Sequence, residues 1–320
     1  MVSVVEPYEL RQRQTIAVLN KMPEDYRRFL KPDVVSKLSG MEIKARLVVE
    51  GFIAGLHKSP YHGFSVEFAE HRQYMPGDSL KNVDWKVYAK TDRFFIKEFE
   101  EETNLKAYIL LDTSGSMGYS SNGINKLEYS SYLSAALSYL MLKQRDAVGL
   151  VTFDENIKKY IPPKSALKSH LHVLLEELDR IEPSQTTNVS SALHRMAERI
   201  KRRGLIILIS DLFDDPDKVI NGLKHFRHKK HEVIVFHVLD PKERTFSFPE
   251  LAIFKDLETN EELMTSPWQI RKEYTERVKA LVNKYTLECR GSMIDYVLLD
   301  TSIPFDYALY SYLSKRQRLW

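Results

Sequence analysis

From Asn104 onward, the chain alternates between short, almost continuous apolar runs and longer segments whose apolar residues recur at helical spacing. The runs include LKAYILLD, DAVGLVTF, GLIILISD and HEVIVFHVLD, and the segments include KLEYSSYLSAALSYLMLKQR and VSSALHRMAERIKRR. Strands of a parallel sheet are buried on both faces, so they carry apolar residues at successive positions. The alternation therefore predicts a doubly wound α/β domain, with helices on both faces of a mostly parallel sheet.

A polar, turn-rich insert interrupts this pattern from about Lys242 to Ser266, and LAIFKDLETNEELMT within it predicts a β-hairpin. A helix, a strand near MIDYVLLD and a closing helix after Pro304 follow. Before the α/β pattern, helical segments around 26–49 lead into a stretch that mixes aromatic, charged and turn-forming residues. We therefore divide the chain into an N-terminal unit, 1–103, and an α/β domain, 104–320.

Composition narrows the classes of function. Lysine plus arginine total 47 against 44 acidic residues, and the net charge of +3 gives no overall excess that would suit a nucleic acid. No apolar run approaches the roughly 20 residues of a spanning helix, which leaves only peripheral membrane association open. The start of the chain does not resemble a secretion signal, and the single Cys289 forms no internal disulfide. We expect a cytoplasmic protein.

The stretch YILLDTSGSMGY places a carboxylate and two hydroxyls directly after the first predicted strand. Asp112, Ser114 and Ser116 alternate, so in an extended loop their side chains project to one side. Ligands of doubly wound sheets bind beyond the carboxyl ends of the strands, where this loop lies. Oxygen ligands favour a hard cation such as Mg²⁺, which requires further ligands from other loops.

Two other loops occupy comparable positions. GLIILISDLFDD places Asp211 at the end of another buried strand, and SQTTNVSSAL places Thr187 just before a helix. An Asp-x-Ser-x-Ser sequence alone is more often a turn or a helix cap. Three concordant loops at strand ends favour a cation site instead.

Together these loops resemble a von Willebrand factor A domain with a metal-ion-dependent adhesion site, over about 105–239. The resemblance implies that the hydroxyls bind the cation directly and that the carboxylates bind it directly or through water, with the ligand set Ser114, Ser116, Thr187, Asp112 and Asp211. It also implies that a carboxylate from a partner completes the shell. Mg²⁺ is the expected ion, and Mn²⁺ or Ca²⁺ are alternatives.

The N-terminal half carries a second resemblance, to the DUF58 family of bacterial von Willebrand A-like proteins. Its signature is a Glu-Phe, an Arg-x-Tyr, a Pro-Gly-Asp and an Asp-Trp, filled here by Glu67, Phe68, Arg72, Tyr74, Pro76, Gly77, Asp78, Asp84 and Trp85. Many relatives carry membrane helices ahead of this region, and we expect none in this chain. The family is commonly encoded beside MoxR-type AAA+ ATPases, so the resemblance implies a partner or adaptor of such an ATPase.

These observations favour a non-enzymatic protein whose bound cation bridges to an acidic side chain of a partner or its client. The alternative is a magnesium-assisted hydrolase in which Asp112 or Asp211 acts as the base. No G-x-x-x-x-G-K-[ST] sequence occurs, so the chain is not itself a P-loop ATPase. The basic stretch that holds His225, His228 and His231 suggests solvated histidines rather than a transition-metal site.

Overall fold

The computed structural model describes residues 31–58, 71–73, 88–89, 92, 94–97, 105–184, 188–248, 252–255 and 262–317. Its centre is a six-stranded sheet in the order β10-β7-β6-β3-β4-β5. The parallel strands are β3 (Lys106–Asp112), β4 (Ala147–Phe153), β6 (Leu205–Ser210), β7 (Glu232–Leu239) and β10 (Asp295–Asp300). The edge strand β5 (Ile157–Lys164) is antiparallel to β4.

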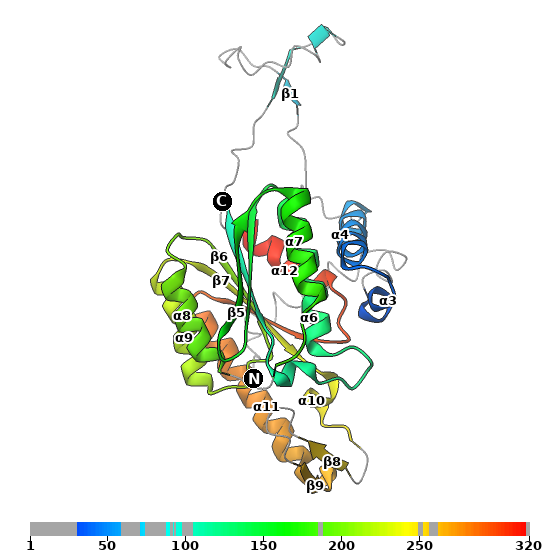
Figure 1. The fold of residues 1–320 in the computed structure, drawn as a ribbon, viewed down its shortest axis with the longest axis vertical. Coiled ribbons are helices and arrows are strands. Elements are labelled where there is room, and N and C mark those ends of the chain that lie inside the picture. Colours follow the sequence, from blue (N-terminus) through cyan, green and yellow to red (C-terminus); the bar gives the residue numbers. More distant parts are fainter. Residues whose placement is uncertain are drawn as a thin grey trace, which may run out of the picture.

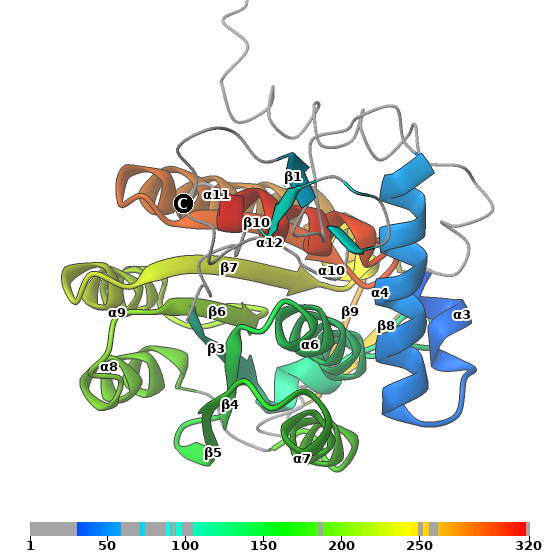
Figure 2. The same ribbon diagram turned by 90° about the horizontal axis from the view of Figure 1, so that it is seen from above.

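Helices cover both faces of the sheet (Figure 2). One face packs against α6 (Lys126–Lys143), α7 (Leu167–Asp179) and α12 (Asp306–Gln317). The other packs against α8 (Val189–Arg199), α9 (Pro216–His228) and α11 (Pro267–Gly291). The central strand β3 faces both layers, because Ile109 lies in the first core and Leu110 in the second. This arrangement confirms the predicted doubly wound α/β fold.

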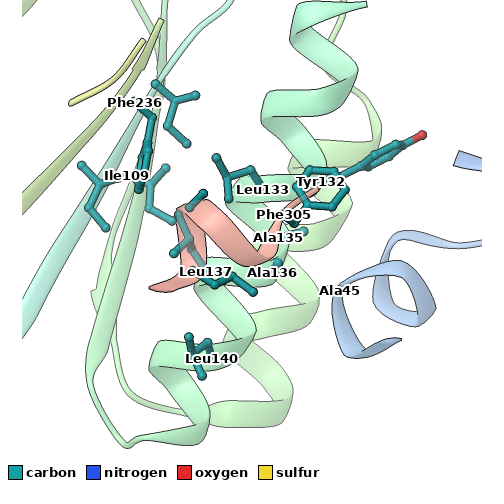
Figure 3. Close-up of a cluster of buried hydrophobic side chains, with 14 of the residues drawn as sticks. Ala45, Ile109, Tyr132, Leu133, Ala135, Ala136, Leu137, Leu140, Phe236 and Phe305 are labelled. Atoms are coloured by element: carbon teal, nitrogen blue, oxygen red, sulfur yellow. The ribbon is translucent and has the colours of Figure 1, made fainter. Parts of the chain in front are cut away.

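The first core also includes a helix from the N-terminal part of the chain. After α3 (Pro32–Ser36), the longer α4 (Met41–Lys58) packs against α6 and α7, and its Phe52 is fully buried. Figure 3 shows Leu133 and Leu137 of α6 beside the strand that carries Ile109. Residues 41–53 therefore share one core with the α/β domain.

Most residues of the DUF58-like signature lie outside the described residues. Arg72 is the exception, in the short strand β1 (His71–Gln73), which pairs antiparallel with β2 (Phe95–Lys97). The helix expected around 26–49 is described from residue 31 onward, as α3 and α4.

The predicted insert contains a short helix, α10 (Pro241–Thr245), followed by the hairpin of β8 (Ala252–Lys255) and β9 (Glu262–Thr265). Strand β5 was not predicted. Its sequence, IKKYIPPK, holds two prolines and buries only Ile161 of its eight residues, so it lacks the continuous apolar run of the parallel strands. An antiparallel edge strand tolerates both features, because only one side of it forms hydrogen bonds.

The parallel strands give the sheet two different edges. We call the edge where they end the carboxyl edge and the edge where they begin the amino edge. In Figure 1 the carboxyl edge is at the bottom, where α10 and the β8–β9 hairpin lie. Helices α6, α8, α9 and α11 begin at the carboxyl edge and end at the amino edge (Figure 1). None of the described helices is both long and apolar enough to cross a bilayer.

Candidate metal centre

Two buried carboxylates lie at the carboxyl edge. Asp112 is the last residue of β3, and Asp211 directly follows β6, the neighbouring strand. Both side chains are fully buried. The loop after β3 continues into a short 3₁₀ helix, Gly115–Gly118, which carries Ser116. The Oγ atoms of Ser114 and Ser116 are 3.2 Å apart. The structure thus brings four of the five predicted ligands to the ends of two adjacent strands.

The spacing of the two hydroxyls fits a small, hard cation. Octahedral Mg²⁺ binds oxygens at 2.0–2.1 Å, which separates neighbouring ligands by about 2.9 Å. The hydroxyls of Ser114 and Ser116, at 3.2 Å, are close to that separation. Among the described residues, no group of three or more His, Cys, Asp or Glu side chains is arranged to hold a metal. A cation at this edge would therefore rely on hydroxyls as well as on carboxylates.

Hydrogen bonds orient the Asp112 carboxylate. Its Oδ1 accepts from the backbone N–H of Ser114 at 2.9 Å, and its Oδ2 accepts from the hydroxyl of Ser210 at 2.6 Å. Each carboxylate oxygen has two lone pairs, so each keeps one for a cation or its water. The carboxylate is thus held in place before any ion binds.

The fifth predicted ligand, Thr187, lies outside the described residues. The described residues on both sides of it are firmly held. Ser184 donates from its N–H and its hydroxyl to the Thr113 carbonyl, at 2.7 and 2.9 Å. Asn188 caps α8 by accepting from Ser191 N–H at 3.0 Å. The contact between Ser184 and Thr113 places this end of the loop beside the loop after β3.

Sequence reasoning missed a lysine at this centre. Lys126, the first residue of α6, is completely buried, and its Nζ donates to Asp211 Oδ2 at 2.8 Å and to Glu243 Oε1 at 2.6 Å. A cation in the first turn of a helix is disfavoured by the helix dipole. That unfavourable position was the signal in the sequence that Lys126 needs an anionic partner.

Burial and charge together shift the pKa values of this cluster. Burial, and then the charge of Asp211, raise the pKa of Asp112 to about 7. Burial opposes the charge on Lys126, but Asp211 and Glu243 outweigh it and raise the pKa of the ammonium above its usual value. Burial also raises the pKa of Glu243. The ammonium of Lys126 pairs with Asp211 and Glu243, and Asp112 adds a third carboxyl group to the cluster, so added positive charge is favoured.

Helix α10 is tied to the loop after β3 by side-chain contacts. Asp240, which caps α10, accepts from Ser121 N–H at 2.8 Å and also pairs with the Ser121 hydroxyl. Glu243 accepts from Asp240 N–H at 2.7 Å while its other oxygen holds Lys126. The insert thus contributes a carboxylate to the centre, which its polar sequence alone does not reveal.

The histidines of the basic stretch do not form a site. His231 is buried, and its Nδ1 accepts from Gly204 N–H at 3.2 Å, so the expectation of a solvated side chain is wrong for this residue. His225 lies 3.0 Å from Glu198 Oε1, and His228 is exposed. Their partners lie on different elements, which argues against a shared metal.

A family model described as "Protein of unknown function DUF58" matches residues 70–283. The chain belongs to the DUF58 family. Among curated proteins, this DUF58 protein is 23% identical over 217 residues to the uncharacterized proteins Rv1480 of Mycobacterium tuberculosis and Mb1516 of Mycobacterium bovis. Each match covers 66% of this chain and 67% of the relative.

Solved structures also match part of the chain. The conserved hypothetical protein BatB from Bacteroides thetaiotaomicron matches with a TM-score of 0.45 and 18% identity, over 68% of this chain and 100% of that one. An aerotolerance-related membrane protein from Bacteroides fragilis gives 0.48 and 18%, over 66% and 99%. The SpRpn10 VWA domain gives 0.36 and 10%, over 65% and 94%.

Proposed function

We propose that this DUF58 protein is a non-enzymatic interaction module that binds an acidic side chain of a partner through a cation at the carboxyl edge. The observation that carries the proposal is the pair of buried carboxylates, Asp112 and Asp211, beside two hydroxyls 3.2 Å apart. Oxygen donors of this kind suit Mg²⁺, with Mn²⁺ or Ca²⁺ as alternatives. A bound dication with an incomplete protein shell supplies a strong attraction for an outside carboxylate.

The surrounding residues fix the donors in advance. Ser114 N–H and the Ser210 hydroxyl hold Asp112, while Lys126 holds one oxygen of Asp211. The other oxygen of Asp211 accepts from Phe213 N–H at 3.3 Å. Because these carboxylates are already oriented, little conformational freedom is lost when an ion binds.

A magnesium-assisted hydrolase is the second candidate, and one observation favours it. The pKa of Asp112, raised to about 7 by burial and by Asp211, suits a general base at neutral pH. We prefer the binding function because Asp112 is fully buried, away from a substrate in solvent, whereas a cation that it holds can still reach a carboxylate outside. Turnover of phosphoester or peptide substrates with Mg²⁺ would establish the hydrolase instead.

The partner we propose is a MoxR-type AAA+ ATPase, with a client that supplies the acidic residue, in the cytoplasm. The choice of this partner rests on the family resemblance. The need for an outside carboxylate rests on the oxygen ligands at the carboxyl edge, which leave the shell of the cation incomplete. The protein would act as an adaptor in chaperone-like assembly or maturation.

A binding titration with a purified MoxR-type ATPase tests the proposal. Wild type and Ser114→Ala are each measured with Mg²⁺ and with chelator, and Ser165→Ala, an exposed hydroxyl at the opposite edge, is the matched control. We expect chelation and Ser114→Ala to weaken the complex without adding to one another, because both remove the same bridge. Equal binding in all conditions would refute the cation bridge, and no binding in any condition would remove this partner.

A further inference from the structure

The amino edge of the sheet carries a row of basic side chains. The turns that lead into the parallel strands lie side by side there, as the pairing of Leu205 with Glu232 and of Lys106 with Ala147 shows. Figure 2 looks onto this edge. The basic residues of the row, from β5 to β7, are Lys164, Arg145, Lys106, Lys201, Arg202, Arg203, Lys229 and Lys230. Most of them are exposed.

Two cations of the row pair with acidic residues: Lys229 with Glu198 at 2.9 Å, and Arg203 with Glu232 at 3.8 Å. The acidic residues of the row pair mainly with basic residues outside it. Asp146 pairs with Arg316 at 3.0 Å. Glu232 pairs with Arg227 and with Lys315, both at 2.8 Å. Lys315 also pairs with Asp295 at 2.8 Å. Among the described residues, the exposed Lys164, Lys201, Arg202 and Lys230 therefore give the row an excess of positive charge, although the whole chain carries only +3.

Three turns of this edge share an unusual backbone. Each closes its helix with a hydrogen bond from residue i to residue i−5: Asp146 N to Met141 O, His231 N to Phe226 O, and Ile294 N to Cys289 O. The residue before each donor has a left-handed φ, a position that normally favours glycine.

These left-handed positions hold long side chains instead of glycine. They are occupied by Arg145, Lys230 and Met293, with φ of 63°, 64° and 56°. Met293 is 71% exposed, although it lies in the turn next to Lys229 and Lys230 along the row. Lys230 and Met293 are thus kept on the surface at a conformational cost, which points to a role outside the fold.

We propose that the amino edge docks on an anionic phospholipid surface, with the exposed cations on the lipid phosphates and Met293 in the headgroup region. A broad row of cations suits a charged bilayer surface, and a single apolar side chain adds to such binding. A nucleic acid is the less suitable anion, since none of the turn residues 144–146, 201–204, 229–231 and 292–294 is Phe, Tyr or Trp, which would stack on bases.

This docking would orient the molecule. The amino edge and the candidate metal centre lie at opposite ends of the parallel strands, so the centre would face away from the lipid and toward soluble partners. The inference does not depend on the cation, because no residue of the row takes part in the metal centre.

Vesicle co-sedimentation of the full chain tests the proposal. We expect binding to phosphatidylcholine vesicles that contain phosphatidylglycerol, none to phosphatidylcholine alone, and weaker binding at higher salt. The triple variant Lys201→Glu, Arg202→Glu, Lys230→Glu should lower partition by at least about 100-fold, since each cation near an anionic bilayer contributes roughly five-fold. The matched control, Lys158→Glu, Lys218→Glu, Lys272→Glu, changes the net charge equally at exposed sites outside the row.

The control should keep the partition of the wild type within about three-fold, because its charges lie outside the contact. Circular dichroism spectra verify that both triple variants fold. An equal loss in the two variants would show that net charge alone drives binding and would overturn the proposal. So would the absence of binding to the anionic vesicles, or binding to duplex DNA or RNA in place of vesicles at the same salt.

Discussion

Replacing Lys126 with methionine removes a buried positive charge while keeping most of the side-chain volume. The ammonium lies 2.8 Å from Asp211 Oδ2 and 2.6 Å from Glu243 Oε1, and no part of its side chain is exposed. Removing one partner of a buried ion pair typically costs about 3–5 kcal/mol, because the remaining charge stays buried. In Lys126→Met, two carboxylates lose their partner at once.

Proton uptake reduces this cost. Burial raises the pKa of Glu243, and Asp112 already has a pKa of about 7, so this cluster can take up a proton when the ammonium is lost. We therefore expect a loss of about 3 kcal/mol at neutral pH, the lower end of that range. A loss of this size lowers the melting temperature by about 6–12 °C in a domain of this size.

Urea unfolding in the presence of chelator measures the loss. The matched control is Lys284→Met, because Lys284 lies 2.7 Å from Asp217 but the two side chains are 40% and 74% exposed. Exposed pairs contribute less than about 1 kcal/mol. Mg²⁺ should then stabilise Lys126→Met more than it stabilises wild type, since a dication restores positive charge beside Asp211. Equal, small losses in Lys126→Met and Lys284→Met would refute this account of the buried charges.

Three further predictions concern other parts of the molecule. Asp112→Ala and Ser114→Ala should keep the circular dichroism spectrum and melting temperature in chelator close to wild type while abolishing Mg²⁺-dependent association. Lys230→Gly and Met293→Gly should each raise the free energy of unfolding by about 0.5 kcal/mol, because relief of left-handed strain exceeds the added freedom of the unfolded glycine, and both should weaken vesicle binding. Burial lowers the pKa of His237 to about 4, so the folded state binds fewer protons than the unfolded state, and up to about 3 kcal/mol of stability is lost as the pH falls from about 6.5 to 4. The raised pKa of Asp112 has the opposite effect on stability as the pH falls. Comparing the urea midpoints of wild type and His237→Gln across this range isolates the loss due to His237, because both proteins keep Asp112.

Local sequence pattern was sufficient to predict most of the sheet. The run GLIILISD predicts β6 correctly. Every residue of Leu205–Ser210 is buried, which is why the strand is an almost continuous apolar run in the sequence. Helix α8 was predicted to continue to Arg203, but it ends at Arg199, since Ile200 adopts an extended backbone and buries its side chain. Periodicity reports which faces are apolar, and it does not report where a helix is cut short by packing of its last apolar residue.

The charge network of the candidate centre lay beyond such patterns. Lys126 meets Asp211 across 85 positions of sequence and Glu243 across 117. Asp112 and Asp211 could be placed together because both follow apolar strand runs, which is a local signal. Nothing comparable marks Glu243, whose position depends on how α10 packs at the end of β7. Long-range contacts between single polar side chains leave no repeat in the sequence to detect.

The antiparallel strand β5 determines how this molecule can meet other proteins. Pro162 and Pro163 lack N–H groups, so the outer side of β5 offers fewer donors to an incoming chain. Lys158 and Lys159, each with 54% of the side chain exposed, add charge to the same strand. Edge strands of this kind resist pairing with a further strand. A partner therefore gains little by extending the sheet through β-augmentation at β5, and recognition there must rely on loops and side chains rather than on backbone pairing.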